Sequence, residues 1–185
     1  MSASVVKAML LVGYLRRDDV RRRSLTPAEQ ARLGAMICVS DNAAATQTYG
    51  MLGDTALRDV ARRAGMRRYD VRGHWANSQI TAADQARFFA RVDQLVPERH
   101  RSYAMRQLAS IANGQRWGIP EGIDASDDVW FKGGWRGTGR GQLVHQAALV
   151  EHAGARWSVA ILTDGNPSHA YGVQTVRGIA ERLFR

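Results

Sequence analysis

The sequence predicts a single α+β domain in which helices pack on a small antiparallel sheet. Up to about residue 118 the apolar residues recur at helical spacing. Three short runs rich in Val, Trp, Leu and Ile follow, separated by glycine-containing turns, which is typical of consecutive antiparallel strands. The 185 residues, 45% of them hydrophobic, suffice for one sizeable core, and no internal repeat divides them, so we expect one domain over residues 1–185.

The first 65 residues are predicted to form helices on both sides of a polar interruption. Residues 4–17 carry apolar side chains on most sides and predict a largely buried helix with Ser4 at its start. Thr26-Pro27-Ala28-Glu29 is a capping box with proline at the first helical position, which predicts a helix running toward Val39. After Ser40-Asp41-Asn42 comes the alanine-rich run 43–52, and a further helix is predicted from Asp54 to near Gly65.

The remaining elements are separated by one irregular loop, residues 66–79. Thr81 and Asp84 predict the start of a helix over residues 82–95, and residues 97–111 support another. The extended runs 128–134, 142–152 and 156–163 predict a three-stranded meander. The chain closes on an amphipathic helix predicted over residues 170–184.

The charge and the apolar runs argue against several classes of protein. The net charge is +9, but the arginines are scattered in pairs and triplets without interleaved aromatic residues, so we expect no nucleic-acid partner and favour an anionic substrate or surface. The longest apolar stretch, residues 8–12, is far below the roughly 20 residues of a membrane span, and no cleavable leader precedes it. We therefore expect neither a transmembrane segment nor a signal peptide in the chain.

Single side chains outside the motifs are predicted to have structural roles. Cys38 is the only cysteine and has apolar neighbours, which predicts a buried small residue. No metal site is expected, because the histidines lack ligand spacing: His74, His145, His152 and His169. Four tryptophans are predicted to lie in the core, with Trp135 also at a pocket rim: Trp117, Trp130, Trp135 and Trp157.

Only two of the 26 basic residues are lysines, and each lies in a pattern for which a lysine has chemical value. Lys7 closes Ser4-Val5-Val6-Lys7, and Lys132 opens Lys132-Gly133-Gly134. Arginine stays protonated in proteins, whereas a buried lysine can lose its proton near neutral pH and accept one from a nucleophile. The two lysines are therefore candidate catalytic residues, although an N-cap serine followed by a lysine, or a solvated strand lysine, would give the same patterns.

The spacing of these residues fits nucleophilic catalysis. Ser4 and Lys7 share one helix face, so a neutral Lys7 could activate the Ser4 hydroxyl. Ser40 could relay a proton to a leaving group and Asn42 could offer its amide to a substrate, although Ser40-Asp41-Asn42 could equally be a capping turn. Lys132, followed by two glycines, could bring positive charge and backbone N–H groups against a pocket.

These three patterns resemble the S-x-x-K, S-D-N and K-T-G motifs of class A β-lactamases and penicillin-binding proteins. The resemblance covers nearly the whole chain and includes Gln79-Ile80-Thr81 and Gly118-Ile119-Pro120. It implies a β-lactamase/transpeptidase-like fold, with helices on an antiparallel sheet and the family's N-terminal strands missing. It also implies Ser4 as the acylated nucleophile, Lys7 as the base, Ser40 and Lys132 in proton transfer and carboxylate binding, and the N–H groups of Ser4 and Trp135 as the oxyanion hole.

The chain departs from that pattern at two positions of the site. The loop at 66–79 contains no glutamate to activate a deacylating water, only Asp70, so efficient β-lactam hydrolysis is not expected. Gly133 stands where a threonine or serine usually binds the substrate carboxylate, and Arg136 or Arg140 could substitute. Where the family has strands before its nucleophile, Ser4 is nearly the first residue, which predicts an exposed sheet edge and a homodimer or domain swap through it.

The sequence thus predicts a serine hydrolase that forms an acyl-enzyme with amide, ester or β-lactam carbonyls and releases it slowly, without metal or cofactor. The expected catalytic residues are Ser4, Lys7, Ser40 and Lys132, and the expected substrate-binding residues are Asn42, Gly134, Trp135, Arg136 and Arg140. The resemblance implies a small-molecule or peptidoglycan-like substrate and a bacterial, extracytoplasmic setting at the cell envelope. The alternative is a catalytically degenerate member that binds a ligand or a protein.

Overall fold

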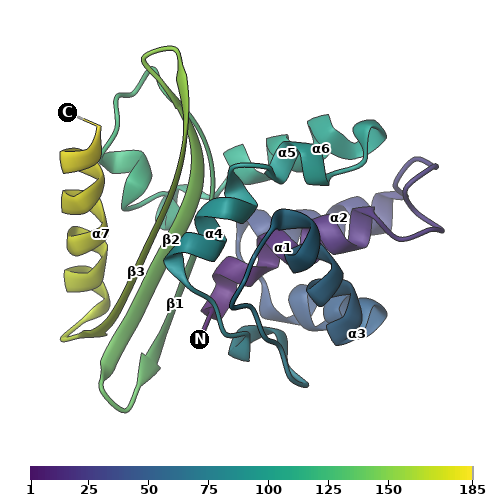
Figure 1. Ribbon diagram of the computed structural model, residues 1–185, viewed down its shortest axis with the longest axis horizontal. Coiled ribbons are helices and arrows are strands. Elements are labelled where there is room, and N and C mark those ends of the chain that lie inside the picture. The colour runs from purple at the N-terminus through teal and green to yellow at the C-terminus, as the bar shows by residue number, and fades with distance from the viewer. Residues whose placement is uncertain (185) are drawn as a thin grey trace.

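A three-stranded antiparallel sheet with helices on both faces forms the protein (Figure 1); the computed structural model describes residues 1–184. The strands β1 (Asp128–Thr138), β2 (Gly141–His152) and β3 (Ala155–Asn166) lie in the order β1-β2-β3. The helix α7 (His169–Leu183) covers one face, and the other long helices lie on the opposite face. The predicted fold class is therefore confirmed, and every strand is longer than predicted because both turns are tight.

The helical layer is built around a helix that is buried on every side. All residues of α1 (Lys7–Leu15) are buried, which confirms the predicted buried helix. No helix among residues 1–184 is long and apolar enough to cross a membrane. The other elements of this layer are η1 (Ala3–Val6), α2 (Pro27–Cys38), α3 (Asn42–Ala64), η2 (Trp75–Asn77), α4 (Ala82–Phe89), α5 (Val92–Leu95), α6 (Glu98–Ala109) and η3 (Asn113–Gln115). The short helix η4 (Ile119–Glu121) packs against α7 instead.

Two helix predictions need correction, and one predicted boundary is confirmed. Ser4 does not start an α-helix but lies in the single 3-10 turn η1. The boundary predicted between the run 43–52 and the helix from Asp54 is confirmed by a kink within α3 at Gly53, whose φ of 65° and ψ of −178° few other residues adopt. The helix predicted over residues 82–95 is two helices, α4 and α5, because the backbone leaves the helical region at Arg91.

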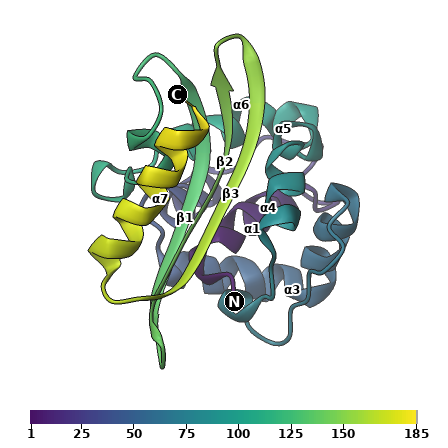
Figure 2. The ribbon, with the colours of Figure 1, turned by 60° about the vertical axis from the view of Figure 1, so that its left-hand side comes forward.

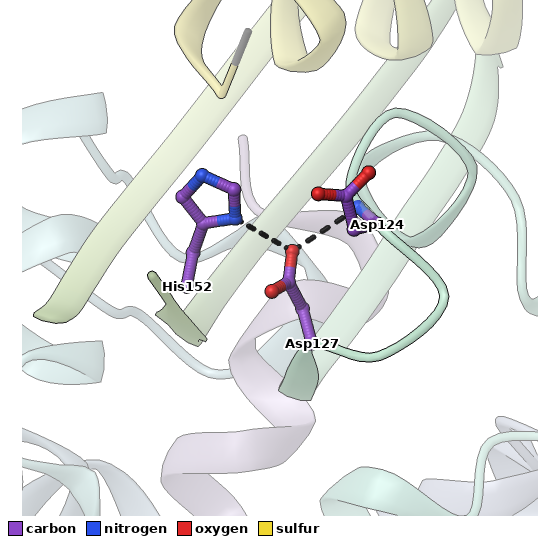
Figure 3. A group of neighbouring side chains, drawn as sticks. All are labelled: Asp124, Asp127 and His152. Carbon is purple, nitrogen blue, oxygen red and sulfur yellow. Dashed lines mark hydrogen bonds and ion pairs between the residues drawn. The ribbon is translucent and has the colours of Figure 1, made fainter. Parts of the chain in front are cut away.

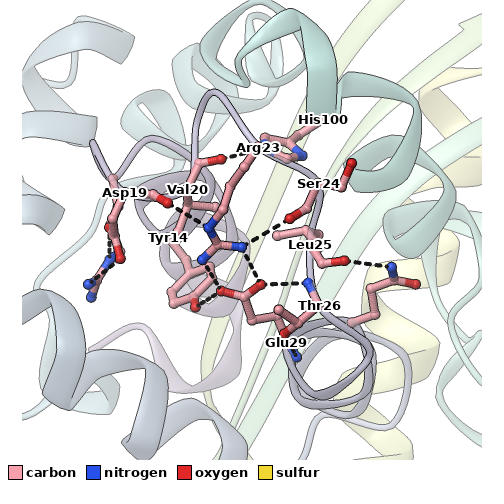
Figure 4. A network of polar contacts seen from close by, with 11 residues as sticks. Tyr14, Asp19, Val20, Arg23, Ser24, Leu25, Thr26, Glu29 and His100 are labelled. Atoms are coloured by element: carbon pink, nitrogen blue, oxygen red, sulfur yellow. Dashed lines mark hydrogen bonds and ion pairs between the residues drawn. The ribbon is translucent and has the colours of Figure 1, made fainter.

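The predicted capping box is confirmed and is part of a larger polar network (Figure 4). The Thr26 backbone donates to Glu29 at 2.7 Å, and Tyr14 donates its hydroxyl to the same carboxylate at 2.6 Å. Arg23 adds two hydrogen bonds of 2.7 and 2.8 Å, and together these donors hold the pKa of Glu29 well below its usual range. The network fixes the loop between α1 and α2, and so the position of α1 under the site.

Trp157 does not lie in the core as predicted. Half of its surface is exposed on β3, which has a single neighbour in the described sheet (Figure 2). Leu183 at the end of α7 is 55% exposed beside it, and both line an apolar groove of about 350 Å³. An edge strand leaves such side chains uncovered because nothing packs beyond it.

Candidate active site

Lys7 lies at the centre of the candidate site and is fully buried. Its Nζ donates to the carbonyl oxygen of Ser40 at 2.5 Å, to the Ser40 hydroxyl at 3.1 Å and to Oδ1 of Asn42 at 2.8 Å. These three acceptors satisfy the three N–H groups of an ammonium. When Lys7 loses its proton, it can keep the two shorter bonds and accept a hydrogen bond from a hydroxyl instead.

The environment of Lys7 favours that loss. Burial lowers the pKa of Lys7 to about 8, and the charge of Asp41 opposes part of this shift. A substantial fraction of Lys7 is therefore neutral at mildly alkaline pH, which is what a proton acceptor requires.

The backbone of Ser40 is held in an unusual conformation that aims two oxygens at Lys7. Its φ of 57° lies in the left-handed region, which a residue with a side chain rarely adopts. Asp41 follows as the N-cap of α3 and accepts a hydrogen bond from the Ala44 backbone at 2.7 Å. Non-glycine strain of this kind persists where the surroundings enforce it, often at functional sites.

Ser4 lies where β1 passes closest to the helical layer. A Cβ added at Gly134 would lie 2.7 Å from the backbone nitrogens of both Ser4 and Val5, so only glycine allows this approach. Ser4 is partly exposed, and its hydroxyl has no hydrogen-bond partner within residues 1–184, Lys7 included. The candidate nucleophile thus has no side-chain hydrogen bond within the described residues and lies one turn before its candidate base.

Lys132 is the second buried lysine of the site. It has no exposed surface, and its Nζ donates to the carbonyl oxygen of Gly133 at 3.0 Å. Burial, reinforced by the positive charge of Lys7, lowers its pKa to about 7, while Cys38 acts in the opposite direction. The close packing of Gly134 on the backbone nitrogens of Ser4 and Val5 shows that the first and third motifs meet in the folded chain.

An aromatic ring, not a carboxylate, contacts Lys7 from the loop at 66–79. The ring centroid of Trp75 lies 4.8 Å from the Lys7 Nζ, and Trp75 is itself buried. The acid of this loop, Asp70, contacts Arg72 at 2.9 Å and Arg58 at 3.7 Å instead. Sequence reasoning missed Trp75, because no local pattern in an irregular loop indicates which side chain turns inward.

The predicted substrate-binding residues are distributed unequally around this centre. Asn42 contacts Lys7 through its oxygen, and Gly134 contacts the Ser4 backbone. Arg136, two residues further along β1, donates to Oδ1 of Asn77 at 3.1 Å. Arg140 lies in the turn between β1 and β2 and pairs with Asp164, so the structure does not join it to the other site residues.

Cys38 is only partly buried rather than fully buried as predicted. Its Sγ lies 3.3 Å from Oε1 of Gln107, and burial raises the pKa of the thiol. A thiol that resists ionisation is a poor nucleophile, so Cys38 does not compete with Ser4.

One group in the described chain has the composition of a metal site. The ligand atoms of Asp124, Asp127 and His152 lie within 4.8 Å of one another (Figure 3). His152 contacts Asp127 at 2.8 Å, and the Asp124 backbone donates to the same carboxylate at 3.1 Å. These bonds tie the start of β1 to the end of β2, about 20 Å along the strand from Gly134, so we assign the group a structural role.

The pKa of Lys7 predicts the pH dependence of acylation. With neutral Lys7 as the candidate base, the rate of Ser4 acylation should rise about tenfold per pH unit below pH 8 and level off above it. Lys7→Arg, which keeps the charge but cannot lose it, should lower the rate by about 10²–10⁴-fold. Stopped-flow acylation with a chromogenic β-lactam between pH 6 and 9.5 measures this, and a flat profile would contradict Lys7 as the base.

Known structures share this fold. The extended-spectrum β-lactamase TLA-1 matches with a TM-score of 0.84 and 11% identity over 99% of this chain and 83% of that one. A class A β-lactamase from Mycobacterium abscessus matches with a TM-score of 0.77 and 18% identity over 98% and 82%. PBP-A matches with a TM-score of 0.73 and 16% identity over 98% and 79%, and a mutant of PBP-A has been solved as an acyl-enzyme complex with penicillin G.

A sequence comparison supplies the family. No curated protein matches the chain. A model of the Beta-lactamase enzyme family matches residues 30–185, which include Ser40, Asn42 and Lys132, while Ser4 and Lys7 lie before the matched range. With this match over most of its length and the predicted β-lactamase-like fold, the chain belongs to the β-lactamase enzyme family.

Proposed function

We propose that the protein is an active-site serine hydrolase that is acylated at Ser4 by β-lactam, ester or amide carbonyls and deacylates slowly. The observation that carries the proposal is the buried Lys7, which donates hydrogen bonds to Ser40 and Asn42 and follows the Ser4 hydroxyl by one turn. Gly134 of the third motif packs on the Ser4 backbone beside it. Three motifs far apart in the sequence thus supply one nucleophile, one base and one proton relay.

The reaction follows from these contacts. Neutral Lys7 takes the proton of Ser4 while Oγ attacks the carbonyl carbon, and backbone N–H groups of Ser4 and Trp135 stabilise the resulting oxyanion. Lys7 then returns a proton through the Ser40 hydroxyl, 3.1 Å away, to the departing nitrogen or oxygen. The C–N or C–O bond breaks and an ester on Ser4 remains.

Release of that ester is expected to be slow. Hydrolysis needs a base to activate a water. The side chain that this loop places against Lys7 is the indole of Trp75, which cannot accept a proton from water as a carboxylate could. Asp70 faces arginines and does not contact Lys7. We therefore propose a penicillin-binding rather than an efficient penicillin-hydrolysing behaviour, with a peptidoglycan-like substrate in an extracytoplasmic setting.

Intact-protein mass after incubation with penicillin G tests the proposal directly. We expect one adduct with the full mass of the antibiotic, because opening the lactam ring expels no fragment, and no adduct on Ser4→Ala. An adduct that persists on Ser4→Ala would contradict the assigned nucleophile. Absence of any adduct together with retained non-covalent binding would favour the alternative, a catalytically degenerate ligand-binding member.

We also propose that a second copy of the chain pairs along the open edge of β3. The β2–β3 turn has two residues of positive φ, Ala153 and Gly154, and the residues beside such a turn exchange hydrogen bonds. Alternate residues of β3 then direct their backbone groups to the open edge: Arg156, Ser158, Ala160 and Leu162. Antiparallel pairing centred on Ala160 would place Arg156 opposite Asp164 of the second copy, joining opposite charges at both ends.

Light scattering on the eluting protein measures this association, and we expect a dimer. Arg156→Asp should weaken it about tenfold, and the swapped pair Arg156→Asp with Asp164→Arg should restore it. In the monomer these side chains have other partners, Asp93 for Arg156 and Arg140 for Asp164, which the variants also change. A monomer at all concentrations would contradict the pairing.

A further inference from the structure

Three aromatic side chains from separate segments meet beside the third motif. Trp117 precedes η4, Trp135 follows Gly134 on β1, and His169 begins α7. The ring centroids of the two tryptophans lie 5.8 Å apart, and each lies 5.5 Å from that of His169. We call these three residues the aromatic cluster.

The aromatic cluster fills the space that a larger third-motif residue would need. A Cβ added at Gly133 would lie 3.2 Å from two ring atoms of Trp117, which is 8% exposed and therefore held by its neighbours. A threonine at residue 133 would force this ring aside. Glycine at position 133 and the indole of Trp117 beside it therefore depend on each other: the ring occupies the space that a threonine side chain would need.

The cluster lies within reach of a substrate bound to Ser4. Side chains alternate along a strand, so Gly134 faces the Ser4 backbone while Gly133 and Trp135 face the side of α7. β1 pairs only with β2 in the described sheet, so no further strand separates the two faces at its other edge. An upper limit on the distance from the Trp117 ring to the Ser4 nitrogen follows from the chain of contacts between them. It adds the distance from the ring to the Gly133 Cβ position, the backbone from Gly133 to Gly134, and the distance from the Gly134 Cβ position to the nitrogen, which together give about 13 Å.

The surroundings of the cluster are poorly suited to a substrate carboxylate. Arg136 is bonded to Asn77 and to Met1 Sδ, and Arg116 lies over the ring of Phe131. Lys132 is fully buried and bonded to the Gly133 carbonyl. Within residues 1–184 no Lys or Arg lies over a ring of the cluster, and a carboxylate moved there from water would lose hydration without such a cation beside it.

The same surroundings suit a flat uncharged group. Trp135 and His169 are partly exposed, so both rings offer surface to a bound group. The three rings already meet edge to face or tilted, the geometry that a further ring can extend.

We propose that the aromatic cluster is a substrate subsite for an uncharged aromatic group, where a hydroxyl-bearing third motif would hold a carboxylate. The effect of this subsite on the rate of acylation rests on the proposed acylation at Ser4, whereas its effect on binding does not. We assign the specificity to Trp117, Trp135 and His169, and we name the substrate class as neutral acyl donors with a ring beside the scissile carbonyl.

Penicillin G, its methyl ester and its benzyl ester test the subsite, because they differ only in the group that replaces the carboxylate. We expect the second-order acylation rate, measured by intact mass, to be about tenfold higher for the benzyl ester than for the free acid, with the methyl ester between. Trp135→Ala should remove the advantage of benzyl over methyl. Trp157→Ala, a tryptophan on the β3 edge, should keep it.

Binding to the Ser4→Ala variant separates the subsite from the chemistry. Calorimetry on this variant should give tighter binding of the benzyl ester than of the free acid, again dependent on Trp135. Equal or tighter binding of the free acid, or a benzyl preference unchanged by Trp135→Ala, would overturn the subsite. A benzyl preference in binding without an adduct on the unmodified protein would overturn acylation and leave the subsite standing.

Discussion

Replacing Lys132 with methionine is expected to stabilise the protein at pH 6 by about 5 kcal/mol while abolishing acylation. Lys132 has no exposed surface, and its pKa falls from 10.5 to about 7. Each pKa unit corresponds to about 1.4 kcal/mol, so keeping Lys132 protonated in the folded chain costs about 5 kcal/mol of stability. Methionine has similar length and no charge, so it removes the cost and should raise the melting temperature by about 10 °C.

The pH dependence distinguishes this cause from a general packing gain. Between pH 7 and 10.5 the unfolded chain binds the Lys132 proton and the folded chain does not, so the stability of the unmodified protein rises with pH across this window. The advantage of Lys132→Met should therefore shrink from pH 6 to pH 9. Urea unfolding at both pH values measures it, and an advantage that stays constant would show that the charge is not responsible.

Lys132→Arg is the matched control for function. Arginine keeps the positive charge but cannot lose it, so we expect this variant to be less stable than the unmodified protein at every pH and also inactive. Acylation by Lys132→Met at more than a hundredth of the original rate would contradict a role of the Lys132 amine in proton transfer.

Replacing Gly134 with alanine is expected to disable the site by displacing the nucleophile. The added Cβ would lie 2.7 Å from two backbone nitrogens and 3.1 Å from the Ser2 carbonyl oxygen, and backbone atoms cannot rotate away. The strand and η1 must separate, which we expect to cost about 1–3 kcal/mol of stability. A displacement of about 1 Å can lower the acylation rate by about 10²-fold.

Gly137→Ala on the same strand is the matched control. Its Cβ would lie 3.6 Å from the Gln142 side chain, an ordinary contact, and its backbone needs no left-handed conformation. We expect this variant to retain both its melting temperature and its acylation rate. If Gly134→Ala were acylated as fast as Gly137→Ala, the close packing of β1 on η1 would not position Ser4.

The elements predicted from local pattern were those with strong local signals. Thr26 and Glu29 form a capping box through bonds three residues apart, so the sequence alone contains both partners. The break at Arg91 and the single turn around Ser4 were missed, because each depends on how the helix meets its neighbours and not on its own periodicity. Trp157 was placed in the core because a tryptophan in a strand usually is, and no pattern in a strand indicates that it lies at an edge.

The sequence by itself determined the chemistry available to this protein: a serine three residues before one lysine, a Ser-Asp-Asn turn and a second lysine before two glycines. Only the tertiary structure decided how these groups act. Lys7 and Lys132 have lowered pKa values because chain segments far from them in sequence exclude water, and burial depends on the whole fold. Likewise Trp75 contacts Lys7, and Trp117 and His169 meet Trp135, across distances in sequence that no local pattern spans.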